Sequence, residues 1–329
     1  MQVGILGVAH MHAVTYAALL GEMSGVQLAV IADEDEVRGR ELAARFNSRW
    51  EKDYQTALSF PLDAVIVASE NSRHREMAMA ALEARLPVLC EKPLATRVED
   101  AEAMVAESER RGVVLATAFP MRHSLPIRRL YDYLQTGALG RIVALNGTNR
   151  GQNPGGWFIR PELSGGGAVL DHTVHVIDLM RWYTGSEVVE VYAEIGTMHR
   201  ECPVDDMGLL MLEFENGVVA AHDPSWSRPR QAFPTWGDVT LEVLGTEGVA
   251  WVDAFGQRLL AFDETIGKMQ YVPWGDNADH GMLQDFLRVV REGGTPAATG
   301  KDGLEAVRVA LAAYESARAQ KPVRLSYNR

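Results

Sequence analysis

Short apolar runs alternate with helical patterns over the first 118 residues of the chain. The apolar runs predict buried strands at residues 3–6, 26–32, 64–68, 88–90 and 113–117. The segments between them predict helices at residues 11–23, 37–46, 73–84 and 98–111. Because strands that alternate with helices are typical of βαβ units, we predict an α/β domain with a parallel sheet over residues 1–118.

Beyond residue 118 the pattern changes to longer strand-like segments joined by turn signals. Asn216-Gly217 separates two such segments, and this dipeptide favours a tight hairpin turn. Residues 245–248 separate another pair, 239–244 and 249–252. Helical patterns at 168–183, 282–291 and 304–319 and a short strand at 323–325 complete a second predicted domain, 119–329, whose C-terminal helix is free to pack back on the first domain.

The composition excludes several classes of protein. A net charge of -12 disfavours nucleic acid and anionic membranes as partners, and no apolar run reaches the roughly 18 residues of a membrane helix. Cys90 and Cys202 are too few for a disulfide framework and lack the paired spacing of a zinc site. The N-terminus has no basic leader. We therefore expect a cytoplasmic protein without a bound metal.

The loop after the first predicted strand occupies the position of a dinucleotide fingerprint. Gly7 suits the tight turn, and Ala9 is small enough for a pyrophosphate to approach; His10 and Met11 complete the predicted cofactor loop. His12 stands where a third glycine is usual. The loop alone is equally consistent with an ordinary strand-to-helix turn.

Asp33 ends the second predicted strand, 26 residues after Gly7, where a carboxylate binds the adenosine ribose. Together with Glu34 and Asp35 it would repel a 2′-phosphate, which favours NAD over NADP. Two alternatives stay open. Asp33 could instead cap the following helix, and Arg38 and Arg40 could reach a 2′-phosphate.

Glu91-Lys92-Pro93 follows the strand at 88–90, and ligands of open α/β sheets bind beyond the carboxyl ends of strands. A lysine there can stabilise the alkoxide charge that develops on a reacting hydroxyl. Pro93 restricts the backbone of Lys92 and so directs its side chain. The alternative without a functional role is that Lys92 is a surface lysine before a turn.

Asp171 and His175 share one face of the helix that follows the triple glycine 165–167, and Asp178 continues that face. A carboxylate beside an imidazole favours a general base, which carbinol oxidation requires. The alternative is a helix-capping aspartate with a buried structural histidine. A zinc site at His172 and His175 is the poorer interpretation, because no further ligands cluster with them.

These motifs, in this order and spacing, resemble the glucose-fructose oxidoreductase, inositol dehydrogenase and MocA (Gfo/Idh/MocA) family. The resemblance is carried by Gly7 with Asp33, Ser69-Glu70-Asn71-Ser72-Arg73-His74, Glu91-Lys92-Pro93, Gly165-Gly166-Gly167-Ala168-Val169-Leu170-Asp171, His175, Gly245-Thr246-Glu247-Gly248 and residues 317–323. It covers nearly the whole chain. The sequence departs from the family pattern at Ala9, His12 and Ser69-Glu70, where a Thr-Pro pair is usual.

The resemblance implies a Rossmann domain followed by an α/β domain built on a large open, mostly antiparallel sheet, through which homodimers or homotetramers form. It implies that Lys92 contacts the nicotinamide ribose and the reacting hydroxyl. It implies that Asp171 and His175 bind substrate and handle the proton. Four further residues are expected to line the cofactor cleft: Ser69, Asn71, His74 and Glu91.

Polar and aromatic residues in irregular segments form a second group of candidates, for a sugar or polyol. They are Arg122, His123, Asn149, Arg150, Gln152, Asn153, Trp157 and Arg160, of which we select Arg122, Asn149 and Trp157. The predicted function is NAD-dependent hydride transfer between nicotinamide and a secondary alcohol or ketone of a sugar, an inositol-like polyol or a related hydroxy compound. The alternatives are NAD-assisted glycoside cleavage and a non-catalytic NAD- or sugar-sensing regulator.

Overall fold

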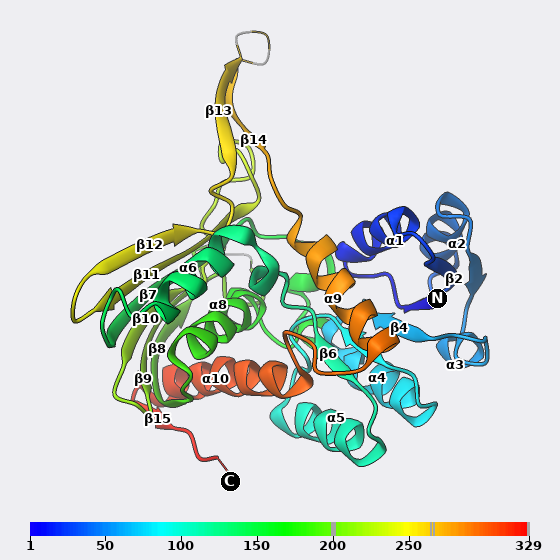
Figure 1. Cartoon of the computed structure of the whole chain (residues 1–329), viewed down its shortest axis with the longest axis horizontal. Coiled ribbons are helices and arrows are strands. Elements are labelled where there is room, and N and C mark those ends of the chain that lie inside the picture. Colours follow the sequence, from blue (N-terminus) through cyan, green and yellow to red (C-terminus); the bar gives the residue numbers. More distant parts are fainter. Residues whose placement is uncertain (199–201, 264, 266, 328–329) are drawn as a thin grey trace. The chain divides into compact units, whose positions relative to one another are not determined.

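The computed structural model describes residues 1–198, 202–263, 265 and 267–327. The chain divides into two compact units (Figure 1). The first comprises residues 1–120, 162–165 and 279–307, and the second comprises residues 121–161, 166–278 and 308–329. The chain therefore passes between the units several times, and each unit is described by itself.

The first unit is built on a six-stranded parallel sheet with the order β3-β2-β1-β4-β5-β6. This is the strand order of a Rossmann fold and confirms the predicted fold class. The strands are β1 (Gln2–Leu6), β2 (Gln27–Ala32), β3 (Arg49–Glu51), β4 (Ala64–Val67), β5 (Val88–Cys90) and β6 (Leu115–Thr117). The helices are α1 (His12–Glu22), α2 (Glu36–Arg45), α3 (Tyr54–Ala57), α4 (His74–Glu83), α5 (Val98–Arg111) and α9 (Ala278–Glu292), with η1 (Asn71–Arg73) before α4.

Every predicted strand and helix of this region is present, with ends that coincide or are shifted by at most two residues. The sequence pattern does not predict β3, because Arg-Trp-Glu contains no apolar run. It does not predict α3 either, a single turn started by Asp53, whose side chain accepts from Gln55 N and Thr56 N. Strand β4 shows why the apolar runs predict these strands correctly. All four of its residues are buried, as a parallel strand covered on both faces requires.

The second unit contains a seven-stranded sheet with the order β12-β11-β7-β10-β9-β8-β15. Among the described residues, only β7 and β10 pair in parallel, so this sheet is mostly antiparallel, as expected. Its strands are β7 (Ile142–Gly151), β8 (Val188–Gly196), β9 (Met207–Phe214), β10 (Val219–Asp223), β11 (Gly237–Gly245), β12 (Val249–Asp253) and β15 (Val323–Arg324). A separate ribbon of β13 (Arg258–Asp263) and β14 (Lys268–Pro273) extends from it (Figure 1).

Helix α8 (Ala168–Thr184) packs against this sheet through a close approach at Gly147 of β7. A Cβ at Gly147 would lie 2.5 Å from Val176 Cγ1. Both predicted hairpins are confirmed, and the turn at Gly217 has the positive φ of +81° that this residue supplies. The other helices are η2 (Pro120–His123), α6 (Leu125–Gln135), η3 (Gly156–Ile159), α7 (Pro161–Ser164) and α10 (Gly300–Ala319).

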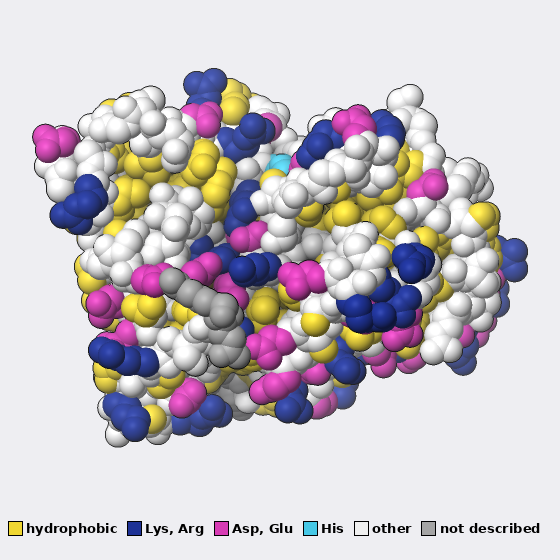
Figure 2. All heavy atoms as spheres, turned by 60° about the horizontal axis from the view of Figure 1, so that its bottom comes forward, with side chains coloured by type: hydrophobic (Ala, Val, Ile, Leu, Met, Phe, Trp, Pro, Cys, Tyr) yellow, Lys and Arg dark blue, Asp and Glu magenta, His cyan; other side chains and the backbone are white. Residues whose placement is uncertain are grey.

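Charged side chains of both signs are spread over the surface. On the face drawn in Figure 2, basic side chains are interspersed with acidic ones and form no continuous basic field. None of the helices in the described ranges has the length and apolar character needed to cross a bilayer.

Candidate active site

Gly7 forms the tight turn that joins β1 to α1. Its φ is +72°, and a Cβ would lie 2.5 Å from Ser69 Cβ and 2.7 Å from Ser69 Cα. Its N–H donates to Ala32 O at 2.8 Å. Only glycine fits this crowded turn, as the sequence predicted.

The first turn of α1 is suited to an anion. The residue before the helix, Met11, is 56% exposed and contributes no side-chain cap, and the first turn holds no acidic residue. The positive end of the helix therefore meets no competing negative charge, although His12 N donates to His10 Nδ1 at 3.2 Å and Ala13 N donates to His10 O at 3.0 Å. His10 is different, because it is buried and its N–H donates to Ala68 O at 3.0 Å.

Asp33 is buried at the carboxyl end of β2 and accepts several hydrogen bonds. Val8 N donates to Oδ2 at 2.7 Å and Asp35 N donates to Oδ1 at 2.8 Å. Arg38 donates to both oxygens, at 2.8–3.2 Å. The helix-capping alternative for Asp33 is wrong, because Asp35 caps α2 by accepting from Arg38 N.

The two arginines that could have bound a 2′-phosphate are both engaged. Arg38 pairs with Asp33. Arg40 pairs with Glu36 at 2.9 Å, and its guanidinium lies 4.3 Å from the centre of the Trp50 ring. This arrangement fits NAD better than NADP.

His74 connects the end of β4 to the turn after β5. Its Nδ1 lies 2.8 Å from Pro93 O and its Nε2 lies 3.3 Å from Ser69 O. Burial lowers the pKa of His74 below its usual value, so the ring is neutral at pH 7. Nearby, Asn71 is buried and its Nδ2 donates to Ser164 O at 2.9 Å. The predicted cofactor residues Ser69, Asn71 and His74 thus lie together in the first unit.

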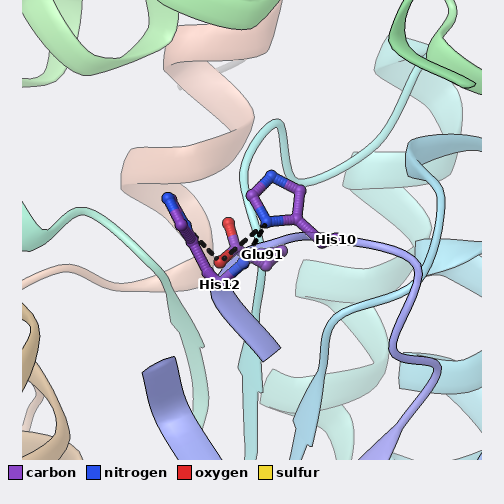
Figure 3. A group of neighbouring side chains, drawn as sticks. All are labelled: His10, His12 and Glu91. Atoms are coloured by element: carbon purple, nitrogen blue, oxygen red, sulfur yellow. Dashed lines mark hydrogen bonds and ion pairs between the residues drawn. The ribbon is translucent and has the colours of Figure 1, made fainter. Parts of the chain in front are cut away.

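Glu91 lies fully buried at the end of β5, next to Lys92, which is 5% exposed. Glu91 Oε1 lies 2.9 Å from His12 Nδ1 and accepts a hydrogen bond from Tyr16 OH at 2.5 Å. Its Oε2 accepts the backbone N–H of Lys92 at 3.0 Å. His10, in the turn before α1, and His12, the first residue of α1, both point towards this carboxylate (Figure 3).

In the second unit, Asp171 and His175 lie on α8 as predicted, Asp171 buried and His175 partly exposed. Asp171 Oδ2 is 3.3 Å from Nε2 of the neighbouring His172. The other ring nitrogen of His172 donates to Pro224 O at 3.0 Å. The two ring nitrogens of His172 therefore face Asp171 Oδ2 and Pro224 O, which fixes the orientation of the ring beside Asp171.

The three predicted substrate residues have different surroundings. Asn149 is fully buried, and its Nδ2 donates to His172 O at 3.2 Å. Arg122 is 9% exposed and donates to both carboxylate oxygens of Asp178, at 2.6 and 2.7 Å. Trp157 is partly buried and stacks on Phe158.

Sequence reasoning missed residues whose contacts come from distant parts of the chain. His172 was considered only as a zinc ligand, and no cluster of metal-binding side chains among the described residues contains it. Asp205 and Tyr314 were not selected, although both contact the start of α8. His12 was noted only as an irregular glycine position; its partner Glu91 is 79 residues away.

Comparisons with known proteins define the class of this protein. Residues 1–119 match the oxidoreductase family with an NAD-binding Rossmann fold, and residues 127–251 match the GFO/IDH/MocA C-terminal domain. A 1,5-anhydro-D-fructose reductase of Ensifer adhaerens is 33% identical over 78% of this chain and 78% of its own. The chain therefore belongs to the Gfo/Idh/MocA family of NAD-dependent oxidoreductases.

Individual relatives are similar to this chain over almost their whole length. Myo-inositol 2-dehydrogenase of Thermotoga maritima is 28% identical over 99% of this chain and 98% of its own. The crystal structure of GenD2 from gentamicin A biosynthesis, in complex with NAD, has a TM-score of 0.91 and 26% identity, and covers 99% of this chain and 97% of its own. The structure of levoglucosan dehydrogenase in complex with NADH and levoglucosan has a TM-score of 0.84 and 26% identity, and covers 98% of this chain and 99% of its own. The predicted family, fold, cofactor and enzyme class are confirmed.

Proposed function

We propose that the protein oxidises a secondary hydroxyl of a sugar, an inositol-like polyol or a related hydroxy compound, reversibly, with the first unit as the cofactor domain and the second unit as the substrate domain. The observation that carries the proposal is Lys92, a nearly buried lysine whose backbone is anchored by Glu91 beyond a parallel strand. The substrates named for myo-inositol 2-dehydrogenase and levoglucosan dehydrogenase support this substrate class.

The cofactor is assigned to residues of the first unit. The positive end of α1, with Gly7, Ala9, His10 and Met11, would hold the pyrophosphate. Asp33 would hold the adenosine ribose. Bound NAD supplies the hydride acceptor. Four further residues are assigned to the lining of the cofactor cleft: Ser69, Asn71, His74 and Glu91.

The reaction requires that a hydroxyl proton leave as the hydride departs. We assign proton removal to His175 and substrate binding and orientation to Asp171, with the Lys92 ammonium stabilising the alkoxide-like charge. Arg122, Asn149 and Trp157 are assigned to substrate hydroxyls and ring surfaces. Because Arg122 is paired with Asp178, its role requires that it share this pairing with the substrate.

The proposal extends to assembly and compartment. Leu209, Met211 and Val219 are 57%, 54% and 47% exposed on neighbouring strands of the second unit's sheet, which supports a homodimer or homotetramer formed through this sheet. Cys90 and Cys202 form no disulfide, which is consistent with a reducing cytoplasm.

The central test is turnover of Lys92→Ala and His175→Ala, measured as NADH absorbance against a panel of sugars and polyols. We expect each variant to lose at least about a hundredfold in kcat. NAD binding, measured by calorimetry, should be retained. The exposed Lys52→Ala is the matched control and should turn over normally. Wild-type rates in both Lys92→Ala and His175→Ala would refute the assignment, and release of sugar without net NADH would indicate glycoside cleavage instead.

A further inference from the structure

The carboxylate of Glu91 is the centre of a buried polar cluster in the first unit. His12 Nδ1, Tyr16 OH and, at 3.7 Å, His10 Nδ1 approach its Oε1. Its Oε2 accepts from the backbone of Lys92. One carboxylate therefore joins the start of α1 to the lysine that we assign to catalysis.

The charges in this cluster are mutually supportive. Burial lowers the pKa of His12, but the carboxylate of Glu91, helped by Asp279 of α9, outweighs burial and raises that pKa above 6.5, against the opposing charge of Lys92. Burial raises the pKa of Glu91, but His10, His12 and Lys92 outweigh it and bring the pKa well below 4.5. Glu91 is therefore ionised at pH 7.

His12 occupies the position at which the dinucleotide fingerprint has its third glycine. A glycine there could make no side-chain contact with Glu91. The side chain of His12 is 33% exposed, whereas Glu91 is fully buried, so the ring lies between the carboxylate and solvent. Without the ring, one oxygen of Glu91 would lose a strong donor and become more accessible to water.

We propose that His12 is a positioning residue for Lys92. It holds Oε1 of Glu91, and the orientation of that carboxylate sets Oε2 against the Lys92 N–H. The irregular residue of the glycine loop thus acts on the reaction through Glu91 rather than by contact with the substrate. The inference rests on the proposed catalytic role of Lys92.

A metal ion is the competing explanation, because ligand atoms of His10, His12 and Glu91 all lie within 4.8 Å of one another. Two contacts speak against it. His10 Nδ1 accepts the backbone N–H of His12 at 3.2 Å, which directs its lone pair away from a shared centre. Tyr16 OH already donates to the oxygen that the metal would need.

The test compares His12→Ala and His12→Gln with wild type and with Val14→Ala, a control at an exposed site of the same helix. We expect His12→Ala to lose at least about tenfold in kcat with little change in the Kd for NAD, because a small misplacement of a catalytic group is costly. His12→Gln keeps a hydrogen-bond donor and should recover part of the loss. In a double-mutant cycle with Glu91→Gln, the combined loss should be smaller than the product of the single losses.

Two measurements without NAD separate positioning from a general structural effect. Proton NMR of the histidines should give His12 a pKa above 6.5 that falls in Glu91→Gln. The stability difference between wild type and His12→Ala should be full below pH 6.5 and should shrink as the pH rises through the pKa of folded His12, since the unfolded ring loses its proton first.

The outcomes are distinguishable from failure of the proposed function. Full turnover in His12→Ala with inactive Lys92→Ala overturns the positioning role and leaves the function standing. Full turnover in Lys92→Ala overturns the function itself. Stoichiometric zinc in the purified protein, lost in His12→Ala, would replace the proposal with a metal site.

Discussion

The carboxylate of Asp33 has two influences on cofactor choice, and both favour NAD. Its charge repels a 2′-phosphate, and it also holds the guanidinium of Arg38, the group that would otherwise attract one. Asp33 is 4% exposed, so this pairing takes place in a largely desolvated position where charge interactions are strong. A single side chain therefore accounts for the preference for NAD.

Replacing Asp33 should change that preference. In Asp33→Ser the repulsion disappears and Arg38 is released, so we expect the Kd for NADP to fall relative to the Kd for NAD by about tenfold, the value of one charge-assisted hydrogen bond. Calorimetric titration with both cofactors measures the ratio. Arg40→Ala is the control, because Arg40 contacts Glu36 and Trp50 and should leave the ratio unchanged. An unaltered ratio in Asp33→Ser would show that Asp33 does not set the preference.

At the scale of elements, the start of α8 depends on two residues from elsewhere in the second unit. Asp205 Oδ1 accepts from Gly167 N at 2.9 Å, and its Oδ2 accepts from Val169 N at 2.8 Å. Tyr314 OH accepts from Gly167 N and Leu170 N and donates to Asp205. These contacts satisfy N–H groups that a helix start leaves open, and they position the helix that carries Asp171 and His175.

Removal of this cap should weaken the fold of the second unit. We expect Asp205→Ala to lower the free energy of unfolding by about 1–2 kcal/mol, the usual cost of a lost helix cap. Denaturant unfolding followed by tryptophan fluorescence measures the change. The exposed Asp132→Ala on α6 is the matched control. If the two variants proved equally stable, Asp205 would not be what holds α8.

At the scale of the whole molecule, the Rossmann unit is completed by a segment from near the end of the chain. Met282, Leu283, Phe286 and Leu287 of α9 join the hydrophobic core that contains residues of β1, α1 and β4. Phe286 is 1% exposed. The cofactor unit therefore cannot form its full core from residues 1–120 alone.

This dependence can be measured by truncating one side chain of α9. Phe286→Ala should lower the free energy of unfolding by about 3–5 kcal/mol, because it leaves a cavity in the core. Phe262→Ala, at a site 82% exposed, should change it by less than about 0.5 kcal/mol. Chemical denaturation with and without NAD gives both values. Similar values for the two variants would mean that α9 is not an essential part of this core.

Elements that depend on adjacent residues could be predicted from the sequence, whereas contacts between distant residues could not. The strands at 64–67 and 88–90, the helix at 168–184 and the hairpin at Gly217 follow from patterns of adjacent residues, and the sequence predicted all of them. Strand β3 was not predicted, because its Arg-Trp-Glu sequence contains no apolar run. The ribbon of β13 and β14 was not assigned to any element beforehand.

By itself the sequence determined the class of most elements, the family and the choice of Gly7, Asp33, Lys92, Asp171 and His175 as candidates, because hydrophobic periodicity and motif spacing are properties of the linear chain. The tertiary structure alone decided which side chains meet. It paired His12 with Glu91, Asp205 with Tyr314 and Asp171 with His172. The first two pairs join residues 79 and 109 positions apart, and hydrogen bonding depends on distances of about 3 Å that spacing along the chain does not encode.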